Sequence, residues 1–335
     1  MRKIVSVIIP VYNGQNYIEN IFRELQSQTY QNLEVIMIDD GSSDDSAIVI
    51  EEYTNSFVYE NGTDGIVFRL IRQQNTGQGG ARNRGIEEAT GDYLVFMDQD
   101  DRVKEDYIEK LLGVAEDDGS DIVISGYEHI IVSGEVKEHV ELTNNEWCRF
   151  MNITPWGKIY RRDFIERENI RFLPVPLGED IYFNVLSYSR AQKVSYTDYV
   201  GYQWVINESS VSNTVHRAVS EESHILTLFD ALVRMDGADK WMRDEQFEYF
   251  MLKTGIFHIL YAAKGTDAKA LIGYRDEVFR WLNDKMPGIE RNRLITFKGP
   301  EGERSSVARA IFIYMKLRRF HLDGAFLRVF RLGKR

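Results

Sequence analysis

Apolar, β-branched runs alternate with helix-like segments over the first part of the chain, and this alternation constrains the fold more than any other feature. The runs are those of strands buried on both faces of a sheet, and four of the intervening segments carry apolar residues at helical spacing. Strands separated by helices in this way form βαβ units around a parallel sheet. The pattern therefore predicts an α/β fold with a mostly parallel, Rossmann-like sheet flanked by helices. The predicted strands are residues 4–12, 33–39, 65–71, 92–97 and 121–125.

The regular alternation ends after Val132, and the chain has a helical pattern from Ala218 onwards. Apolar residues recur there at the spacing of one buried helix face, three or four residues apart. We therefore predict two parts, an α/β domain at residues 1–217 and a helical C-terminal region at residues 218–335.

Composition excludes several classes of protein. The longest apolar stretches are much shorter than the ~20 residues of a membrane-spanning helix, and no signal-peptide pattern follows Met1. The single cysteine, Cys148, excludes an intramolecular disulfide framework and a cysteine-based zinc site. The net charge of −11 argues against broad binding of nucleic acid. We expect a cytoplasmic protein with no nucleic-acid partner.

The last segment of the chain, residues 304–335, has the opposite charge. It contains nine Lys and Arg residues and one acidic residue, interleaved with apolar and aromatic side chains. A basic amphipathic helix of this kind either packs on neighbouring helices with its cations in solvent or lies on an anionic membrane surface. Peripheral contact with the inner face of the membrane is therefore one of two interpretations of this tail.

Polar and acidic residues follow the first four predicted strands. The carboxyl ends of parallel strands form the ligand-binding edge of an open α/β sheet, so these residues are expected to meet there. Asp98, Asp100 and Asp101 come directly after the fourth strand and form a D-x-D-D string. Carboxylate oxygens are ligands for Mg²⁺ or Mn²⁺, whose coordination phosphate oxygens can complete. The edge therefore predicts a site for a divalent ion and a phosphorylated ligand.

Two common nucleotide-binding motifs are absent from the sequence. The first predicted strand is followed by a segment with one glycine, Gly14, and not by G-x-G-x-x-G. The glycine-rich stretch at residues 77–82 has Arg82 where the last glycine of that motif would stand. No G-x-x-x-x-G-K-[ST] string occurs in the chain. The sequence therefore excludes a Rossmann dinucleotide site and a P-loop.

Six motifs, in this order, resemble those of family 2 glycosyltransferases, which have the GT-A fold. The resemblance covers residues 3–213. It implies inverting transfer of a sugar from a nucleotide-sugar donor to a saccharide or lipid-linked saccharide, with a UDP-sugar as the expected donor. It also implies Mg²⁺ or Mn²⁺ as cofactor and a role in surface polysaccharide biosynthesis. Residues 1–101 would form the nucleotide-sugar-binding part and residues 102–217 the acceptor part. The motifs are Val7–Asn13, Val35–Asp44, Asn75–Gly85, Phe96–Asp101, Trp156–Tyr160 and Gly178–Phe183.

The resemblance implies a role for each donor-side residue. Tyr12 would stack on the nucleotide base, with packing in the core as the alternative for this ring. Asp39 would accept a hydrogen bond from the base, and Arg82 would reach the phosphates or the base, with a salt bridge on a helix surface as its alternative. Asp100 would contact the ribose, and Asp101 would hold the metal ion. The other donor-side residues are Pro10, Asn13, Asp40, Gly41 and Asp98.

Inverting transfer also needs a base that takes the proton of the acceptor hydroxyl. The resemblance implies Asp180 as this base, next to Glu179. The same two acids also favour the start of a helix, because carboxylates interact favourably with a helix N-terminus. Trp156 and Lys158 are implied on the acceptor side, and structural packing is the alternative for Trp156.

The sequence departs from the family pattern at two places. Gly157 stands where the family often has Asn, and residues 201–215 lack the basic residue usual in a late flexible segment, with His216 and Arg217 as the nearest substitutes. Two other functions stay open at this point: a metal-dependent nucleotidyltransferase, and a non-catalytic module that binds nucleotide sugars.

Overall fold

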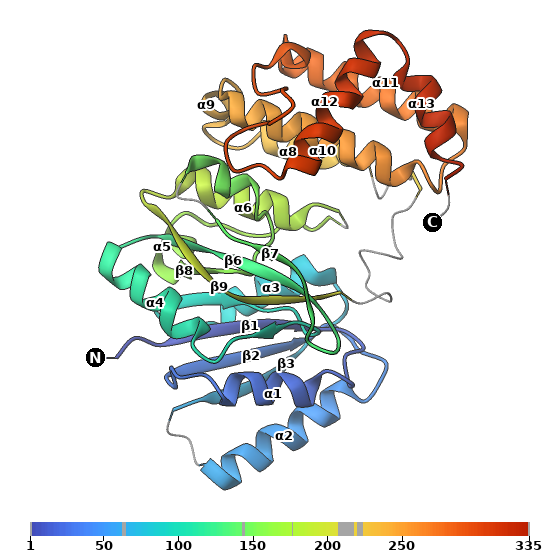
Figure 1. Ribbon diagram of the computed structural model, residues 1–335. Coiled ribbons are helices and arrows are strands. Elements are labelled where there is room, and N and C mark those ends of the chain that lie inside the picture. The colour runs from blue at the N-terminus through green and yellow to red at the C-terminus, as the bar shows by residue number, and fades with distance from the viewer. Residues whose placement is uncertain are drawn as a thin grey trace. The chain divides into compact units, whose positions relative to one another are not determined.

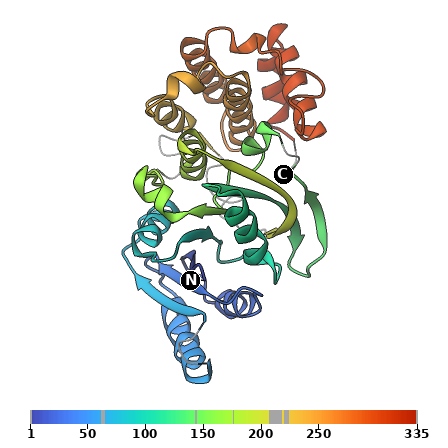
Figure 2. The ribbon, with the colours of Figure 1, turned by 90° about the vertical axis from the view of Figure 1, so that its left-hand side faces the viewer.

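The computed structural model of the chain describes residues 2–61, 65–142, 145–175, 177–206, 218–219 and 224–333 (Figures 1 and 2). The chain divides into two compact units. The first is made of Met1–Asn144, Asn152–Pro174 and Glu179–Asn207, and the second of Asn145–Met151, Val175–Gly178 and Glu208–Arg335. The predicted boundary at 217/218 adjoins residues 207–217, which lie outside the described residues. His216 and Arg217, the suggested substitutes for the missing basic residue, belong to this range.

The first half of the sheet in the first unit is parallel, in the order β3-β2-β1-β4 (Figure 1). The chain moves outward from β1 to β3 and then returns to the other side of β1, which creates a topological switch point between β1 and β4. The Rossmann-like arrangement predicted from the sequence is therefore confirmed. The elements are β1 (Val5–Val11), α1 (Ile18–Gln26), β2 (Leu33–Asp39), α2 (Ser46–Asn61), β3 (Val67–Arg72), α3 (Gly77–Glu88) and β4 (Tyr93–Phe96).

Burial explains why the sequences of these strands are almost continuously apolar. Every residue of β1, β2 and β4 is buried, because helices cover both faces of the sheet. The edge strand β3 is less buried: Phe68 is buried, the next three residues are partly buried and both ends are exposed. The strand ends at the switch point, which carry the predicted donor-side residues, thus rest on a rigid core.

The second half of the sheet contains the antiparallel pairs that the sequence did not indicate. β8 pairs with β4 and β6, β7 with β6, and β5 with β9, all antiparallel, whereas β6 and β9 are parallel. One nine-stranded sheet results. Its elements are β5 (Arg102–Val103), α4 (Tyr107–Asp118), β6 (Ile122–Ile131), β7 (Val136–Val140), β8 (Lys158–Arg161), α5 (Arg162–Arg167), α6 (Glu179–Arg190) and β9 (Val194–Ile206).

The second unit is helical, as the sequence predicts. Asp244 and Asp267 cap its two longest helices by accepting hydrogen bonds from backbone amides of the first turn. None of the helices in the described part of the chain combines the length and apolar composition that crossing a bilayer requires. The elements are η1 (Glu146–Phe150), α8 (Ile225–Val233), α9 (Ala238–Trp241), α10 (Glu245–Ala262), α11 (Ala268–Lys285), η2 (Ile289–Arg291), α12 (Ser305–Arg319) and α13 (Asp323–Phe330).

Candidate active site

Tyr12 follows β1 and has an exposed aromatic ring, 49% accessible to solvent. The Tyr12 amide donates to Oε1 of Gln99 at 3.0 Å, and Nε2 of Gln99 donates back to the Tyr12 carbonyl at 3.2 Å. A Cβ atom on Gly14 would lie 2.3 Å from the same Oε1, so a side chain there would displace the Gln99 amide from these hydrogen bonds. The backbone of Tyr12 is thus fixed to the loop after β4 while its ring stays free, and core packing is excluded for this ring.

The loops after β1 and β2 are joined by side-chain hydrogen bonds. Asn13 has a left-handed backbone (φ 49°), a conformation that Asn tolerates better than most residues, and its Oδ1 accepts from the Ser43 amide at 2.8 Å. Asp39 ends β2 and is buried, and its Oδ1 accepts from the Ser42 amide at 3.0 Å. Pro10 is buried beside Ile38, one residue before the end of β1.

Asp40 has a structural role in the same loops. Its buried Oδ1 accepts hydrogen bonds from Nε2 of Gln73 at 2.7 Å and from the Thr76 amide at 2.9 Å, which ties β2 to the segment before α3. Gly41 follows with a left-handed φ of 75°, and a Cβ there would lie 3.0 Å from the amide nitrogen of Asn75. The Asp40 carboxylate is therefore engaged within the protein.

The three aspartates after β4 differ in their surroundings. Asp98 and Asp100 are partly exposed, whereas Asp101 is buried. Oδ2 of Asp101 accepts from the Tyr202 hydroxyl at 2.6 Å, and its Oδ1 accepts from the Val205 amide at 2.9 Å. Both partners lie on β9, so this strand holds Asp101 against the end of β4.

These aspartates form a concentration of negative charge. Burial, followed by the charge of Asp98, raises the pKa of Asp100 to about 6. Burial, then the charges of Asp98 and Asp100, raises the pKa of Asp101. Each carboxylate oxygen has a second lone pair, so hydrogen-bonded Asp101 can still coordinate a cation. The oxygen donors and surplus negative charge fit a hard divalent ion.

In the part of the chain that the structure describes, no three His, Cys, Asp or Glu side chains form a metal cage by themselves. Mg²⁺ is commonly held by one or two protein carboxylates, with phosphate oxygens and water completing its shell. The aspartates after β4 therefore fit an ion that binds together with a phosphorylated ligand.

Arg82 on α3 connects the aspartates to the start of α6. It is buried, its Nη2 donates to Oδ1 of Asp98 at 2.7 Å, and its Nη1 lies 3.6 Å from Oε1 of Glu179. The guanidinium carbon lies 5.5 Å from the ring centroid of Phe172. Nε and Nη1 are buried and make no hydrogen bond to any described residue. The alternative of a salt bridge on a helix surface is wrong, because this ion pair is buried.

Asp180 lies beside Glu179 in the first turn of α6. Burial, followed by the charge of Glu179, raises the pKa of Asp180 to about 7. Asn184, one turn later, donates through Nδ2 to the carbonyl oxygens of Asp180 at 2.8 Å and Ile153 at 2.9 Å. Asn184 thereby fixes the start of α6 to the loop before β8.

Trp156 and Lys158 are both buried. The ring of Trp156 stacks in parallel on Tyr202, with centroids 4.5 Å apart. Nζ of Lys158 donates to the carbonyl oxygens of Thr154 and Trp156. Burial lowers the pKa of Lys158 well below its usual value, and the charge of Asp180 opposes this shift. The acceptor role of these two residues stays a prediction.

The structure thus connects the strand ends and α6 through Arg82. Gln99, Asn184 and Tyr202 support the site but were not predicted as part of it. Tyr202 lies in a strand-like stretch of the sequence, but its contact with Asp101 spans 101 residues and leaves no local signal.

Comparisons with known proteins give the family. The family model described as "Glycosyl transferase family 2" matches residues 6–176, just over half of the chain. Glycosyltransferase GlyA of Streptococcus pneumoniae is 30% identical over 67% of this chain and 34% of its own length. Putative glycosyltransferase EpsH of Bacillus subtilis is 30% identical over 65% of each chain. This chain therefore spans about a third of GlyA and slightly less than two thirds of EpsH.

The fold has a close counterpart among solved structures. S. aureus TarS 1–349 in complex with UDP-GlcNAc superposes with a TM-score of 0.70, covering 95% of this chain and 92% of that chain at 19% identity. The similarity extends over both the α/β part and the helical part. Together with the motif match, it confirms the predicted GT-A fold. The chain belongs to glycosyl transferase family 2.

Proposed function

We propose that this protein is a glycosyltransferase that moves a sugar, with inversion, from a nucleotide-sugar donor to a saccharide or lipid-linked saccharide acceptor. Surface polysaccharide biosynthesis is the setting that we propose for this reaction. The observation that carries the proposal is the chain of ion pairs from Asp98 through Arg82 to Glu179. It brings acids suited to a diphosphate-bound cation near a separate acid, Asp180, that can act as a base.

The donor would bind along the ends of β1, β2 and β4, within residues 1–101. The exposed ring of Tyr12 offers a face for base stacking, and Asp39 would accept a hydrogen bond from the base. Asp100 would contact the ribose. Pro10, Asn13, Asp40 and Gly41 shape the wall of this site through the loops that they hold. The UDP-GlcNAc bound to TarS supports uridine nucleotides as the first donors to test.

Asp101 would hold Mg²⁺ or Mn²⁺ together with the donor's diphosphate. When bound, the ion would supply stabilisation of the negative charge on the leaving nucleoside diphosphate. Asp98 would keep Arg82 in place on one side, and the buried guanidinium still has two nitrogens without hydrogen bonds. A donor phosphate would have to reach these buried nitrogens, of which Nη1 also faces Glu179 at 3.6 Å.

Asp180 would act on the acceptor, within residues 102–217. The acceptor hydroxyl oxygen forms a bond to the anomeric carbon of the donor, the bond from that carbon to the diphosphate breaks, and the hydroxyl proton goes to Asp180. A pKa of about 7 suits this role, because the group is partly ionised at neutral pH and still basic enough to take a proton. Glu179, Trp156 and Lys158 would shape the acceptor side.

A thermal-shift screen of nucleotide sugars, with and without Mn²⁺, tests donor binding. A ligand at a hundred times its dissociation constant stabilises the protein by about 2.7 kcal/mol, so the preferred donor should stand out. Tyr12→Ala should reduce this shift. Arg84→Gln is the matched control, because Arg84 is an exposed cation on α3 paired with Glu88. No shift with any uridine or other nucleotide ligand would contradict the proposal.

Donor binding alone does not distinguish a transferase from the two other functions. Formation of a glycosylated product from a panel of acceptors supports transfer. Binding without turnover would favour a non-catalytic module, and release of pyrophosphate from a nucleoside triphosphate would favour a nucleotidyltransferase.

A further inference from the structure

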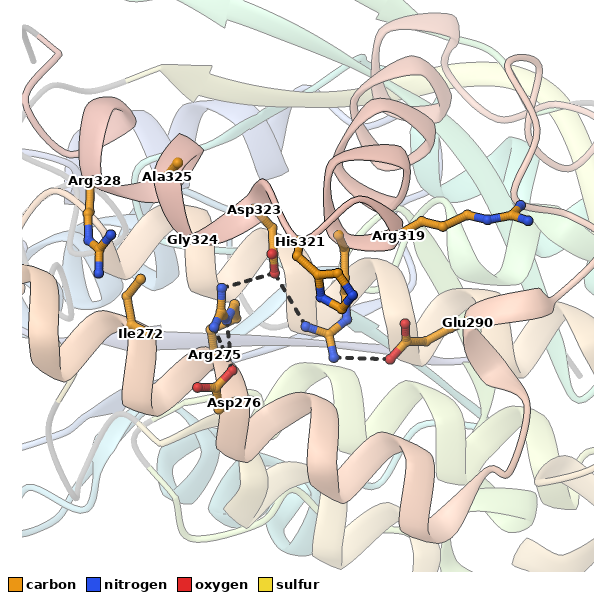
Figure 3. Close-up of a pocket in the computed structure, with 11 residues that line it drawn as sticks. Ile272, Arg275, Asp276, Glu290, Arg319, His321, Asp323, Gly324, Ala325 and Arg328 are labelled. Atoms are coloured by element: carbon orange, nitrogen blue, oxygen red, sulfur yellow. Dashed lines mark hydrogen bonds and ion pairs between the residues drawn. The ribbon is translucent and has the colours of Figure 1, made fainter.

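A charged pocket in the second unit lies between α11, α12 and α13 and has a volume of about 640 Å³ (Figure 3). Its lining includes Arg275 from α11, Arg318 and Arg319 from α12, and Arg328 from α13. Nothing in the proposed transfer reaction uses this pocket. The four arginines exceed the three acids of the lining, Asp276, Glu290 and Asp323, by one, which makes the pocket a candidate site for an anion.

Asp323, the first residue of α13, organises the pocket. It is buried, and its Oδ2 lies 3.1 Å from Nη1 of Arg275 and 3.3 Å from Nη1 of Arg318. Arg318 also pairs with Glu290 at 3.1 Å, and its guanidinium stacks 3.6 Å above the ring of Phe279. Arg275 also pairs with Asp276 at 2.6 Å, so both guanidinium groups are held rigidly and acids balance their charge. Nε of Arg318 is buried without a hydrogen bond to any described residue.

Arg319 and Arg328 supply the charge that the acids do not neutralise. Both are exposed, and neither pairs with an acid among residues 2–61, 65–142, 145–175, 177–206, 218–219 and 224–333. Figure 3 shows Arg328 reaching from α13 toward Ile272 on α11, whereas Arg319 points outward from the lining. Ion pairs with acids thus balance the inner guanidinium groups, and the cations available to a phosphate group lie at the edge of the pocket.

His321 joins this lining from an unusual backbone position. It ends α12 with a left-handed φ of 58°, where glycine is the common choice. The amides of His321 and Leu322 donate to the carbonyl oxygens of Arg318 and Leu317, which closes the helix end. This turn places an imidazole at the pocket and two apolar side chains, Phe320 and Leu322, on either side of it in the sequence.

The apolar neighbours of the pocket are exposed to solvent. Phe320 is 68% accessible, Leu322 51% and Val329 71%. Each is adjacent in the chain to a lining cation or imidazole, so their Cα atoms lie about 3.8 Å from those of pocket residues. Exposed apolar groups beside cations are the chemistry of a membrane interface, where the former enter the acyl boundary and the latter meet anionic headgroups.

One face of α12 continues the same pattern. Arg309, Ile313, Lys316 and Phe320 are all exposed and follow one another at intervals of three or four residues, so they form a single stripe of alternating cations and apolar groups. The protein as a whole has a net charge of −11, and this surface is therefore a local exception. Its charge complements an anionic bilayer.

We propose that the pocket between α11, α12 and α13 binds the phosphate headgroup of an anionic membrane lipid and that Phe320, Leu322 and Val329 insert beside it. The proposal is independent of the transfer reaction. It selects the membrane interpretation of residues 304–335 and identifies a headgroup site within it. Residues 334 and 335 lie outside the described residues and are not needed for the site.

The test is flotation of the full chain with vesicles of phosphatidylcholine alone and with vesicles that also contain phosphatidylglycerol. Each cation near an anionic surface contributes about a fivefold factor in binding, so the double variant R319Q/R328Q should bind about twenty-five-fold more weakly. F320S/V329S should bind at least about a hundredfold more weakly, because it removes two inserted apolar groups at about 1.5 kcal/mol or more each. All four side chains are exposed, and unchanged melting curves would show that the variants fold.

The matched control is K110Q/K240Q, which removes two exposed cations outside α11–α13. We expect it to bind as the unmodified chain does. Equal loss in the control, equal binding to neutral vesicles, or no binding to anionic vesicles would each overturn the proposal. Inorganic pyrophosphate serves as the soluble probe. Stabilisation by pyrophosphate without vesicle binding would identify a site for a free anion and would also overturn the membrane assignment.

Discussion

Each of the two units of this protein contains a cluster of charged residues around a buried charged side chain, and the sign of that central charge differs between them. In the first unit a buried arginine, Arg82, lies between two acids, Asp98 and Glu179. In the second unit a buried acid, Asp323, lies between two arginines, Arg275 and Arg318. Each centre holds its partners by ion pairs. The first cluster has a negative surplus, whereas Asp276 and Glu290 also pair with the arginines of the second, so its positive surplus comes from Arg319 and Arg328.

The sign of that surplus indicates the ligand that each cluster suits. Asp180 adds negative charge near Arg82, and Asp100 and Asp101 add it near Asp98. Burial together with neighbouring carboxylates raises the pKa of all three. Such a place favours a divalent ion and a proton-accepting role. Arg319 and Arg328 add positive charge near Asp323, and that place favours a phosphate group. A buried residue of opposite charge thus lies at the centre of both clusters, one suited to a cation and the other to an anion.

The largest expected effect comes from removing either centre. Arg82→Met removes the cation that Asp98 and Glu179 share. Asp323→Asn removes the buried acid that Arg275 and Arg318 share, although each arginine keeps a second acid on the other side, Asp276 or Glu290. Breaking a buried pair costs about 3–5 kcal/mol, and we expect about 3 kcal/mol for each variant because the partners keep some contact with water. Urea unfolding measures both. Arg82→Lys and Asp323→Glu keep the charge and should lose less, and equal losses would contradict the electrostatic account.

The second largest effect is stabilisation by ligands, which should differ between the two clusters. Saturating Mn²⁺ with UDP, at about a hundred times the dissociation constant, should stabilise the protein by about 2.7 kcal/mol, and Asp101→Asn should remove this gain. Pyrophosphate should stabilise through the other cluster and lose its effect in R319Q/R328Q. Each variant is the control for the other ligand. A variant that loses both responses would show that the clusters do not act separately.

The pH dependence of the transfer rate should depend on the cluster around Arg82 and not on the cluster around Asp323. Asp180 can take a proton only when it is ionised, so the rate should rise through the pKa of about 7 and level off above it, falling tenfold per pH unit below. Glu179→Gln removes a neighbouring negative charge that raises this pKa, and the midpoint should move to lower pH. Initial rates across the pH range measure it. Arg328→Gln should leave the profile unchanged, and a shift toward higher pH in Glu179→Gln would oppose this explanation.

The smallest effect should come from the outer members of the arginine-rich cluster. Arg328→Gln removes an exposed cation without an acidic partner in the described part of the chain, so stability should change by no more than about 0.5 kcal/mol. Urea unfolding beside Asp323→Asn gives the contrast. A loss comparable with that of Asp323→Asn would mean that Arg328 is part of the buried network.

Local sequence predicted the parallel half of the sheet and the strand ends at which the donor-side candidates lie. The strands at 33–39 and 92–97 are recognisable because both of their faces are buried, which leaves an apolar run with an acid at its end. Position at the carboxyl end of such a strand was enough to select Asp39 and Asp98. The family motifs then selected residues, such as Tyr12, that a pattern of burial alone would not.

Contacts between distant segments could not be predicted in the same way. Arg82 meets Glu179, and Asp101 meets Tyr202, only because the chain folds back through the antiparallel half of the sheet. The burial of Lys158 also depends on that half, since its amine is satisfied by backbone carbonyl oxygens and not by an acid. In the second unit, the sequence showed that residues 304–335 are basic, but no local pattern indicated that Asp323 lies at the centre of a pocket.

The central claim is that an acid separate from the donor-binding edge performs the chemical step. Asp180→Asn tests it most directly, with product formation and donor-induced thermal stabilisation measured on the same sample. We predict that transfer falls by a factor of about 10²–10⁴ while stabilisation by the donor is retained. Transfer at the unmodified rate would contradict the claim, and so would loss of donor stabilisation equal to the loss of turnover.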